Sequence, residues 1–144
     1  MTVKITNDYT ASHSIAPKEI IGSSFTVTVD SDPKKSRVYA FATTHIAGNL
    51  YEMTIESRDA NDINLDSTFD VYSVQLKRSD GGGSQEYLGS AVYQSAGLYK
   101  VKLTPTIAGQ YTMTVTIAND YTAFYPSAST QITNSPFIVT VYPG

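Results

Sequence analysis

The stretch YTMTVTI, residues 111–117, alternates strictly between large apolar residues and threonine. Because successive side chains of a β-strand point to opposite faces, this pattern predicts a strand with one buried face and one wet face. Similar alternation recurs at 51–56, 99–104 and 137–142, whereas the spacing of a helix is nowhere sustained. The sequence therefore predicts an all-β fold of antiparallel strands.

An internal repeat sets the domain frame. Residues 2–30 reappear at 114–142 with a constant offset of 112 residues, and 15 of the 29 positions are identical. A self-match at a fixed period is typical of tandem repeats. We therefore expect residues 1–31 to be the last two strands of a preceding copy and residues 32–144 to be one complete repeat.

Seven short strands are expected in the complete copy, separated by turn residues such as DGGGS at 80–84. Their expected ranges are 36–42, 51–56, 69–76, 86–94, 99–104, 111–117 and 137–142. Seven such strands in a unit of this length predict an immunoglobulin-like antiparallel β-sandwich.

The third expected strand is irregular. Phe69 and Val71 share one face, whereas Val74 and Leu76 fall on the other. This change of phase predicts a β-bulge near residues 72–73, because one extra residue moves the following side chains to the opposite face.

Composition excludes several classes of function. The 144 residues include no cysteine, so disulfides and thiolate metal sites are excluded. The net charge of −3 argues against nucleic-acid binding, which needs a basic face. No apolar run approaches the roughly 20 residues that span a bilayer, so direct membrane insertion is not expected. The absence of cysteine and of N-glycosylation motifs favours a cytoplasmic or cytoskeletal location slightly over the cell surface, without deciding between them.

Three motifs in the C-terminal half point to a family. They are GLYKVKLTP at 97–105, AGQYTMTV at 108–115 and NSPFIVTVYP at 134–143. In this order the chain resembles the filamin-type immunoglobulin repeat over about residues 36–143. It departs from the family in the long segment between Ile117 and Phe137, from which we expect a protruding loop at 119–134.

The resemblance implies a function without catalysis. By analogy with the actin-crosslinking filamins of the cytoskeleton, we expect a structural spacer and protein-interaction module of a tandem-repeat protein. The alternative is a cell-adhesion or recognition repeat of an ectodomain, since filamin-like repeats occur there too. An accessory domain of an enzyme is a third class, and it would need a catalytic domain elsewhere. No cofactor is expected, and His13 and His45 lie far apart in the sequence.

The resemblance also implies a groove that captures an extended peptide, because an edge strand with free backbone groups accepts an added strand. The expected groove residues are Ser73, Gln75, Lys77, Tyr87, Gly89, Ala91 and Tyr93. A charged residue at Ser73 or Ala91 is expected to weaken peptide binding and to leave the melting temperature nearly unchanged. The alternative is a solvated edge protected by Lys77 and Arg78.

Two further surfaces are candidates for binding. Tyr121, Phe124 and Tyr125 of the long segment form an aromatic loop that either contacts a partner or folds back to cap the sandwich. Residues 1–31 form an incomplete unit with a bare apolar face, which predicts self-association.

An acidic loop offers a weak candidate for calcium. Its oxygen-bearing side chains are Asp59, Asn61, Asp62, Asn64 and Asp66. The spacing fails the EF-hand pattern, because Ile63 occupies a ligand position and no glycine follows. The alternative is that these residues make turns by bonding their own backbone.

Overall fold

The computed structural model describes residues 2–5, 18–24, 31–66, 70–118 and 129–144. Its strands are β1 (Thr2–Ile5), β2 (Lys18–Ser24), β3 (Arg37–Ala40), β4 (Thr44–Ile46), β5 (Tyr51–Glu56), β6 (Val71–Arg78), β7 (Glu86–Ser95), β8 (Leu98–Leu103), β9 (Gly109–Ala118), β10 (Thr130–Gln131) and β11 (Phe137–Tyr142). The part of the chain that is described contains no helix, and hence none that could cross a membrane.

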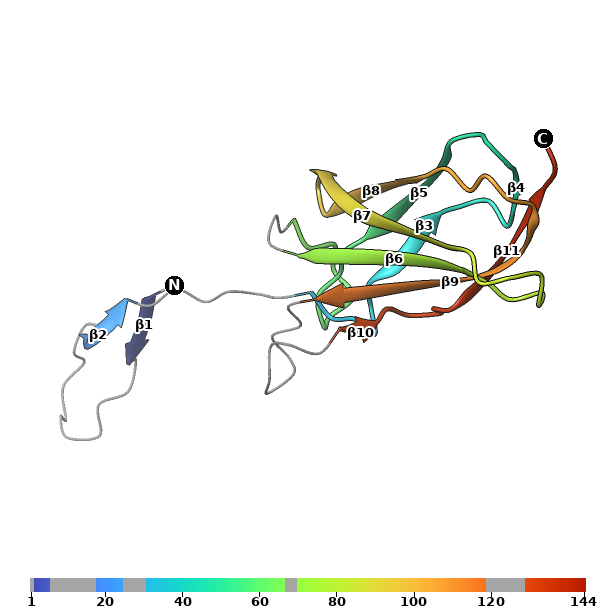
Figure 1. Cartoon of the computed structure of the whole chain (residues 1–144). Coiled ribbons are helices and arrows are strands. Elements are labelled where there is room, and N and C mark those ends of the chain that lie inside the picture. Colours follow the sequence, from blue (N-terminus) through green and yellow to red (C-terminus); the bar gives the residue numbers. More distant parts are fainter. Residues whose placement is uncertain (1, 6–17, 25–30, 67–69, 119–128) are drawn as a thin grey trace.

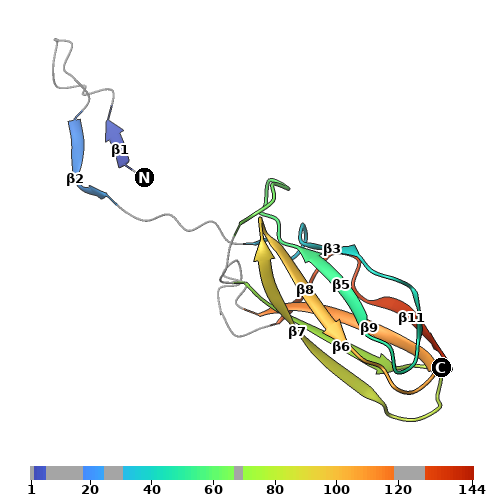
Figure 2. The same cartoon turned by 90° about the horizontal axis from the view of Figure 1, so that it is seen from above.

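Strands β3 to β11 form one curled sheet that folds into two layers. One layer has the order β3-β5-β8-β7, and the other has the order β7-β6-β9-β11-β4, with β10 beside β9. Figures 1 and 2 show β5 and β8 lying over β6 and β9. The expected immunoglobulin-like sandwich is confirmed. The first expected strand, 36–42, corresponds to β3, which pairs with β5. Strand β4, which follows it and pairs with β11 in the other layer, is an addition, as is β10.

The core lies between the layers and follows the alternation of the sequence. In β9 the four large apolar residues are buried, as are Tyr51, Met53 and Ile55 of β5 and their equivalents in β8. Four of the largest fully buried side chains are tyrosines, at positions 51, 72, 99 and 111. Since a buried hydroxyl needs a partner, each of these rings also fixes a polar contact.

Tyr111 makes the contact that is typical of immunoglobulin-like domains. Its hydroxyl donates a hydrogen bond of 2.8 Å to the carbonyl of Ile107, four residues upstream. This arrangement, a tyrosine corner, fixes the connection into the strand that follows. The Tyr111 ring also lies 5.9 Å from that of Tyr87, which links β9 to β7.

The third strand differs from the prediction. The β6–β9 ladder runs without interruption from Val71↔Ala118 to Arg78↔Tyr111, so the predicted bulge near residues 72–73 is wrong. Tyr72, Val74 and Leu76 share the buried face, and Val71 is 48% exposed. The error came from assigning Val71 to the core, whereas the tyrosine beside it is the inward residue.

The long segment before β11 is only partly described. The predicted protrusion at 119–134 falls on residues 119–128, which lie outside the described residues, and on 129–134, which are described. Residues 129–134 pack against the sandwich of residues 31–144, here called the body. Strand β10 pairs with β9, Ile132 is buried, and the Thr133 amide donates to the carbonyls of Pro33 and Ser36. For 129–134 the prediction of a protruding loop is therefore wrong.

Strands β1 and β2 pair with each other in the same register as β9 with β10 and β11. Ile5↔Lys18 and Lys4↔Glu19 correspond, at the offset of 112, to Ile117↔Thr130 and Thr116↔Gln131. Beyond these pairs the register shifts by three residues in both segments. The shifted pairs include Thr2↔Ser24 in the first segment and Met113↔Phe137 in the second. The two segments share a backbone pattern as well as a sequence.

The body begins with an anchored segment. Ser31 donates to Asp70 Oδ1 and Ser57 donates to Asp70 Oδ2, both at 2.7 Å. The Asp32 amide donates to the Arg58 carbonyl at 2.7 Å. Ser31 and Ser57 are both buried. Because a partly buried carboxylate that loses its donors is costly, the Asp70 contacts fix the start of the body.

The chain enters and leaves the body at opposite ends. Ser31 is bonded to Asp70, which directly precedes the end of β6 that pairs with Ala118, the last residue of β9. At the other end, Val141 of β11 pairs with Gly109, the first residue of β9. Figure 1 shows the C-terminus at the end of the body away from β10. Because β9 has ten residues, the two ends are roughly 30 Å apart.

The buried tyrosines predict a decline in stability in alkali. Burial raises the pKa of Tyr51 to about 12. The unfolded chain ionises near pH 10, so this contribution is fully present below about pH 10 and is lost as the pH rises through about 12. We expect the free energy of unfolding, measured with urea and circular dichroism, to fall across this window. Tyr51→Phe should remove about 2–3 kcal/mol of that fall.

Tyr39→Phe is the matched control, because Tyr39 is 66% exposed. It should leave the alkaline decline unchanged. The prediction is contradicted if Tyr51→Phe and the unaltered chain lose the same stability between pH 9 and pH 11.5.

Candidate peptide-binding site

The outer face of β6, β7 and β9 is hollowed. The hollow has a volume of about 440 Å³. It is lined by Ser73, Val74 and Gln75 of β6, by Leu88, Gly89 and Ser90 of β7, and by Thr114 and Thr116 of β9.

Strand alternation brings these side chains together. The buried residues of β9 are Tyr111, Met113, Val115 and Ile117, so its threonines face outward. On β6 the buried residues are again every second one, which leaves Ser73 and Gln75 on the outer face. Cross-strand pairing then places Ser73 beside Thr116 and Gln75 beside Thr114.

The lining is uncharged and mixed in character. It offers hydroxyl and amide groups around Leu88, which is 71% exposed and the most exposed large apolar side chain of the described residues. Gln75 donates to Glu86 at 3.0 Å at the margin. Hydroxyls and amides both donate and accept, which suits the alternating groups of a polypeptide backbone.

The backbone of β6 is paired on both sides. It pairs with β9 along its whole length and with β7 from Ser73↔Ser90 to Lys77↔Glu86. Beyond Ser90, β7 changes partner and pairs with β8, beginning at Ala91↔Val101. The backbone of β6 at the expected groove residues Ser73, Gln75 and Lys77 is therefore already paired with the first half of β7.

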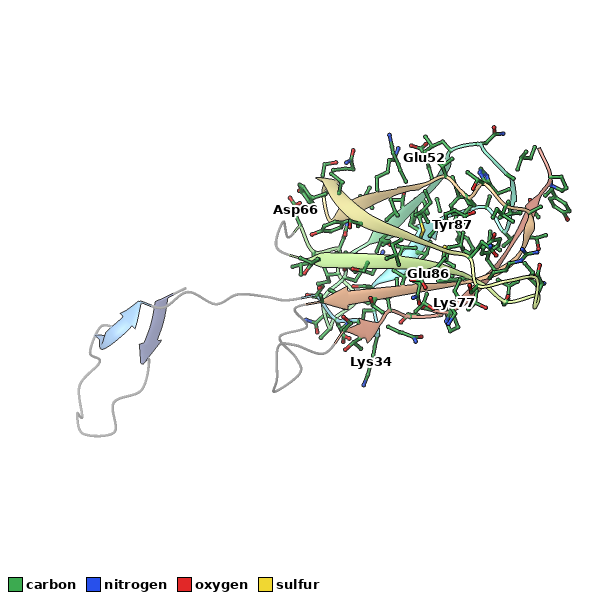
Figure 3. All side chains as sticks on the ribbon, viewed as in Figure 1. Lys34, Glu52, Asp66, Lys77, Glu86 and Tyr87 are labelled. Atoms are coloured by element: carbon green, nitrogen blue, oxygen red, sulfur yellow. The ribbon has the colours of Figure 1, made fainter. Side chains whose placement is uncertain are left out.

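The expected groove residues lie on two faces of the sheet. Ser73, Gln75 and Lys77 face outward, and two of them line the hollow. Tyr87, Gly89, Ala91 and Tyr93 alternate with the exposed Leu88 and Val92 and face inward. Figure 3 shows Lys77, Glu86 and Tyr87 in the same part of the β6–β7 pair.

Ala91 lies on the inner face of β7. It is half-buried and packs against the core. A charged residue at this position would be forced towards the apolar interior. We therefore expect a charged residue at Ala91 to lower the melting temperature, whereas Ser73, on the outer face, remains suitable for the binding test.

Gly89 of β7 lies close to the side chains of two core residues of β8. A Cβ atom at this position would lie 2.8 Å from Leu103 Cδ2 and 3.0 Å from Val101 Cγ1. No larger residue fits without moving these core side chains. The glycine therefore permits β7 to come close to the core just before it changes partner.

Tyr87 and Tyr93 connect β7 to loops. The Tyr87 hydroxyl accepts hydrogen bonds from the amides of Thr106 and Ile107, at 3.0 and 3.2 Å. The Tyr93 hydroxyl donates to Asp66, and this hydrogen bond raises the pKa of Tyr93. Figure 3 shows Asp66 beside the far end of β7.

The acidic loop uses its polar side chains locally. Asp59 accepts hydrogen bonds from the amides of Asn61 and Ile63, both at 2.9 Å. The Asn64 amide donates to the Ala96 carbonyl at 2.6 Å, and Asp66 accepts from Tyr93. Among the described residues, no three histidine or acidic side chains converge as a metal site. The side chains of four of the five calcium candidates, Asp59, Asp62, Asn64 and Asp66, are thus engaged in the loop and its neighbours.

Two arginines surround Glu56 at the base of this loop. Arg58 and Arg37 each donate to the Glu56 carboxylate at 2.9 Å, and Arg58 also donates to Asp62 at 3.2 Å. The hydrogen bond from Arg58 lowers the pKa of Glu56, burial opposes it, and Arg37 adds to the lowering. The cluster holds the acidic loop against β5.

Some expected site residues are not placed. Tyr121, Phe124, Tyr125 and His13 lie outside the described residues. His45 is described, and its Nε2 lies 2.9 Å from the Asn49 carbonyl.

Leu88 belongs to the stretch of 86–94 from which the groove was expected, whereas Ser90, Thr114 and Thr116 were not expected to line it. The outward threonines were visible in the alternation of residues 111–117. Their meeting with Ser73 and Gln75 depends on the β6–β9 pairing, which no local pattern shows.

Comparison with known proteins identifies the family. The model of the Filamin/ABP280 repeat matches residues 30–138. This chain belongs to the filamin repeat family. Among solved structures it resembles the Lin-41 filamin domain, with a TM-score of 0.60 and 20% sequence identity over 80% of this chain and 99% of that one. No curated protein matches the chain significantly.

The family frames the site described above. A filamin repeat is an immunoglobulin-like, non-catalytic type of domain that serves as a structural and protein-interaction module. The neutral hollow on β6, β7 and β9 is thus a candidate contact surface for protein partners.

Proposed function

We propose that this chain is a non-enzymatic structural spacer and protein-interaction module of a tandem-repeat protein, as in the actin-crosslinking filamins. The observation that carries the proposal is the arrangement of the two ends of the body. The chain enters beside the last residue of β9 and leaves beside its first. Copies joined in this way extend along a line, because each begins where the previous one ends.

The β1–β2 pair supports a tandem arrangement. Its register, including the shift of three residues, matches that of β9 with β10 and β11. A preceding repeat that ends in residues 1–31 accounts for both the sequence match and the register. At the offset of 112, Tyr142 corresponds to Asp30, which defines where one copy passes into the next.

The non-enzymatic role is supported by the site itself. The hollow on β6, β7 and β9 is lined by neutral side chains. An acid–base mechanism needs titratable groups within reach of a bound substrate, and this lining offers none.

The spacer role predicts the length of a longer chain. The longer chain is made by joining a second copy of residues 31–144 directly after Tyr142. This join keeps the offset of 112 residues between copies and retains the Ser31–Asp70 hydrogen bond. Small-angle X-ray scattering should show that the maximum dimension increases by about 30 Å or more over the original chain, as the rise of β9 requires. The same maximum dimension for both chains, as expected if the two copies pack side by side, would contradict the spacer role.

We further propose that the partner is an extended peptide that pairs with β6 over Ser73–Lys77. The peptide takes the place of the first half of β7, which pairs with β6 alone. The exchange also breaks the contacts of Tyr87 with Thr106 and Ile107. Because the open state is a minor one, the apparent affinity is lower than the intrinsic affinity by the fraction open.

A disulfide lock tests this exchange, since the chain has no cysteine of its own. Gln75→Cys with Leu88→Cys places the two thiols on directly opposed residues of β6 and β7. Peptides selected from a random phage-displayed library on the unaltered chain should bind the reduced variant. We expect binding to fall at least about ten-fold once the lock is oxidised, because the minor open state is lost.

The matched control locks another pair of the same sheet. Thr112→Cys with Ile138→Cys joins opposed residues of β9 and β11 and leaves β7 free. Its oxidation should not change peptide binding. If the selected peptides bind the oxidised β6–β7 lock as well as they bind the reduced form, the peptide does not replace β7.

Self-association is the last element of the proposal. We propose that residues 1–31 associate with another copy, because a two-stranded sheet alone is marginal in water. Deleting residues 1–30 keeps the Ser31–Asp70 contact and should lower the tendency to dimerise. Static light scattering across a concentration series measures this, and equal monomer masses for both chains at every concentration would contradict it.

A further inference from the structure

A second hollow lies on the other side of β7. It has a volume of about 380 Å³ and is lined by Ser90, Val92 and Gln94 of β7 and by Lys100 and Lys102 of β8. Only Ser90 is shared with the hollow beside β6. We call this second site the lysine hollow.

The ladder explains how its side chains meet. Val92 lies directly opposite Lys100 in the β7–β8 pair. On the other side of β8, Lys100 lies opposite Thr54 and Lys102 opposite Glu52. Tyr99 and Val101 are buried, so both lysines are on the outer face.

The lining of the lysine hollow is positive, whereas the chain as a whole is negative. The chain as a whole carries −3, whereas the hollow is lined by two lysines and no acidic residue. Lys102 has one partner, Glu52 at 3.4 Å, in an exposed pair. Lys100 has no ion pair with any described residue. An exposed pair of this kind is weak, so Lys102 remains available to a better-placed anion.

The apolar part is also exposed. Val92 is 61% exposed beside Lys100. The amide of Gln94 donates to the carbonyls of Val92 and Tyr93, at 3.2 and 3.1 Å. These bonds hold Gln94 along the backbone and keep it from covering Val92.

We propose that the lysine hollow binds an extended, acidic peptide segment of a partner protein. Lys100 and Lys102 are two residues apart on one strand, which separates them by roughly 6.7 Å. Acidic residues at alternate positions of an extended peptide have the same spacing, so both carboxylates meet a lysine. An apolar residue on the same face of the peptide covers Val92.

The test uses the full chain and a defined probe. The probe is a dye-labelled peptide, Glu-Ser-Glu-Ser-Val-Ser-Glu-Ser, whose extended form presents its glutamates and valine on one face. Fluorescence polarisation in about 50 mM salt, where exposed charges are weakly screened, should show binding that weakens as salt is added. The double variant Lys100→Glu, Lys102→Glu should bind at least about ten-fold more weakly.

Lys34→Glu is the matched control, because Lys34 is an exposed lysine that lines neither hollow. It should change the affinity by less than about two-fold. Val92→Ser should weaken binding of this probe but not of a version with serine in place of valine. Circular dichroism melts should show that every variant is folded.

Several results would overturn the proposal. They are an absence of binding at millimolar probe, equal binding by the double variant, and equal binding of a probe with glutamine in place of glutamate. Tighter binding of a single-stranded oligonucleotide to the same two lysines would show that the partner is a nucleic acid instead.

Discussion

Strand β7 has to serve both layers of the fold. Its first half pairs with β6 and its second half with β8, and the change occurs between Ser90 and Ala91. Gly89 makes this possible, because any side chain there would collide with Val101 and Leu103 of the core. Without this change of partner, the curled sheet would divide into two separate sheets, and each would have an open edge.

Both candidate binding surfaces follow from this one crossing. The neutral hollow lies where β7 leaves β6, and the lysine hollow lies where it joins β8; Ser90 lines both. The outward residues Leu88 and Val92 flank that point and are among the most exposed apolar side chains described. A surface that bends between two layers leaves room for ligands that a flat sheet would not.

Alternation in the sequence predicted most of the core correctly, because β5, β8, β9 and β11 each have one buried and one wet face. It failed at β6, where Val71 and Tyr72 compete for the inward position and only the pairing with β9 decides. It left β7 ambiguous, since glycine and alanine occupy two of its inward positions, and at Gly89 the approach is too close for a larger residue. The hollows were hidden for a similar reason: they join residues from strands that are distant in sequence, such as Ser73 and Thr116.

The two ends of the body also determine how it would respond to tension. Strand β4 belongs to the N-terminal part of the chain, and it pairs in parallel with β11 at the C-terminus. When the ends are pulled apart, β4 is drawn backwards and β11 forwards along the same axis. The hydrogen bonds of this pair are then strained together in shear, rather than opened one after another as in a zipper. A sandwich pulled in this direction therefore resists stretching most at the pair formed by β4 and β11.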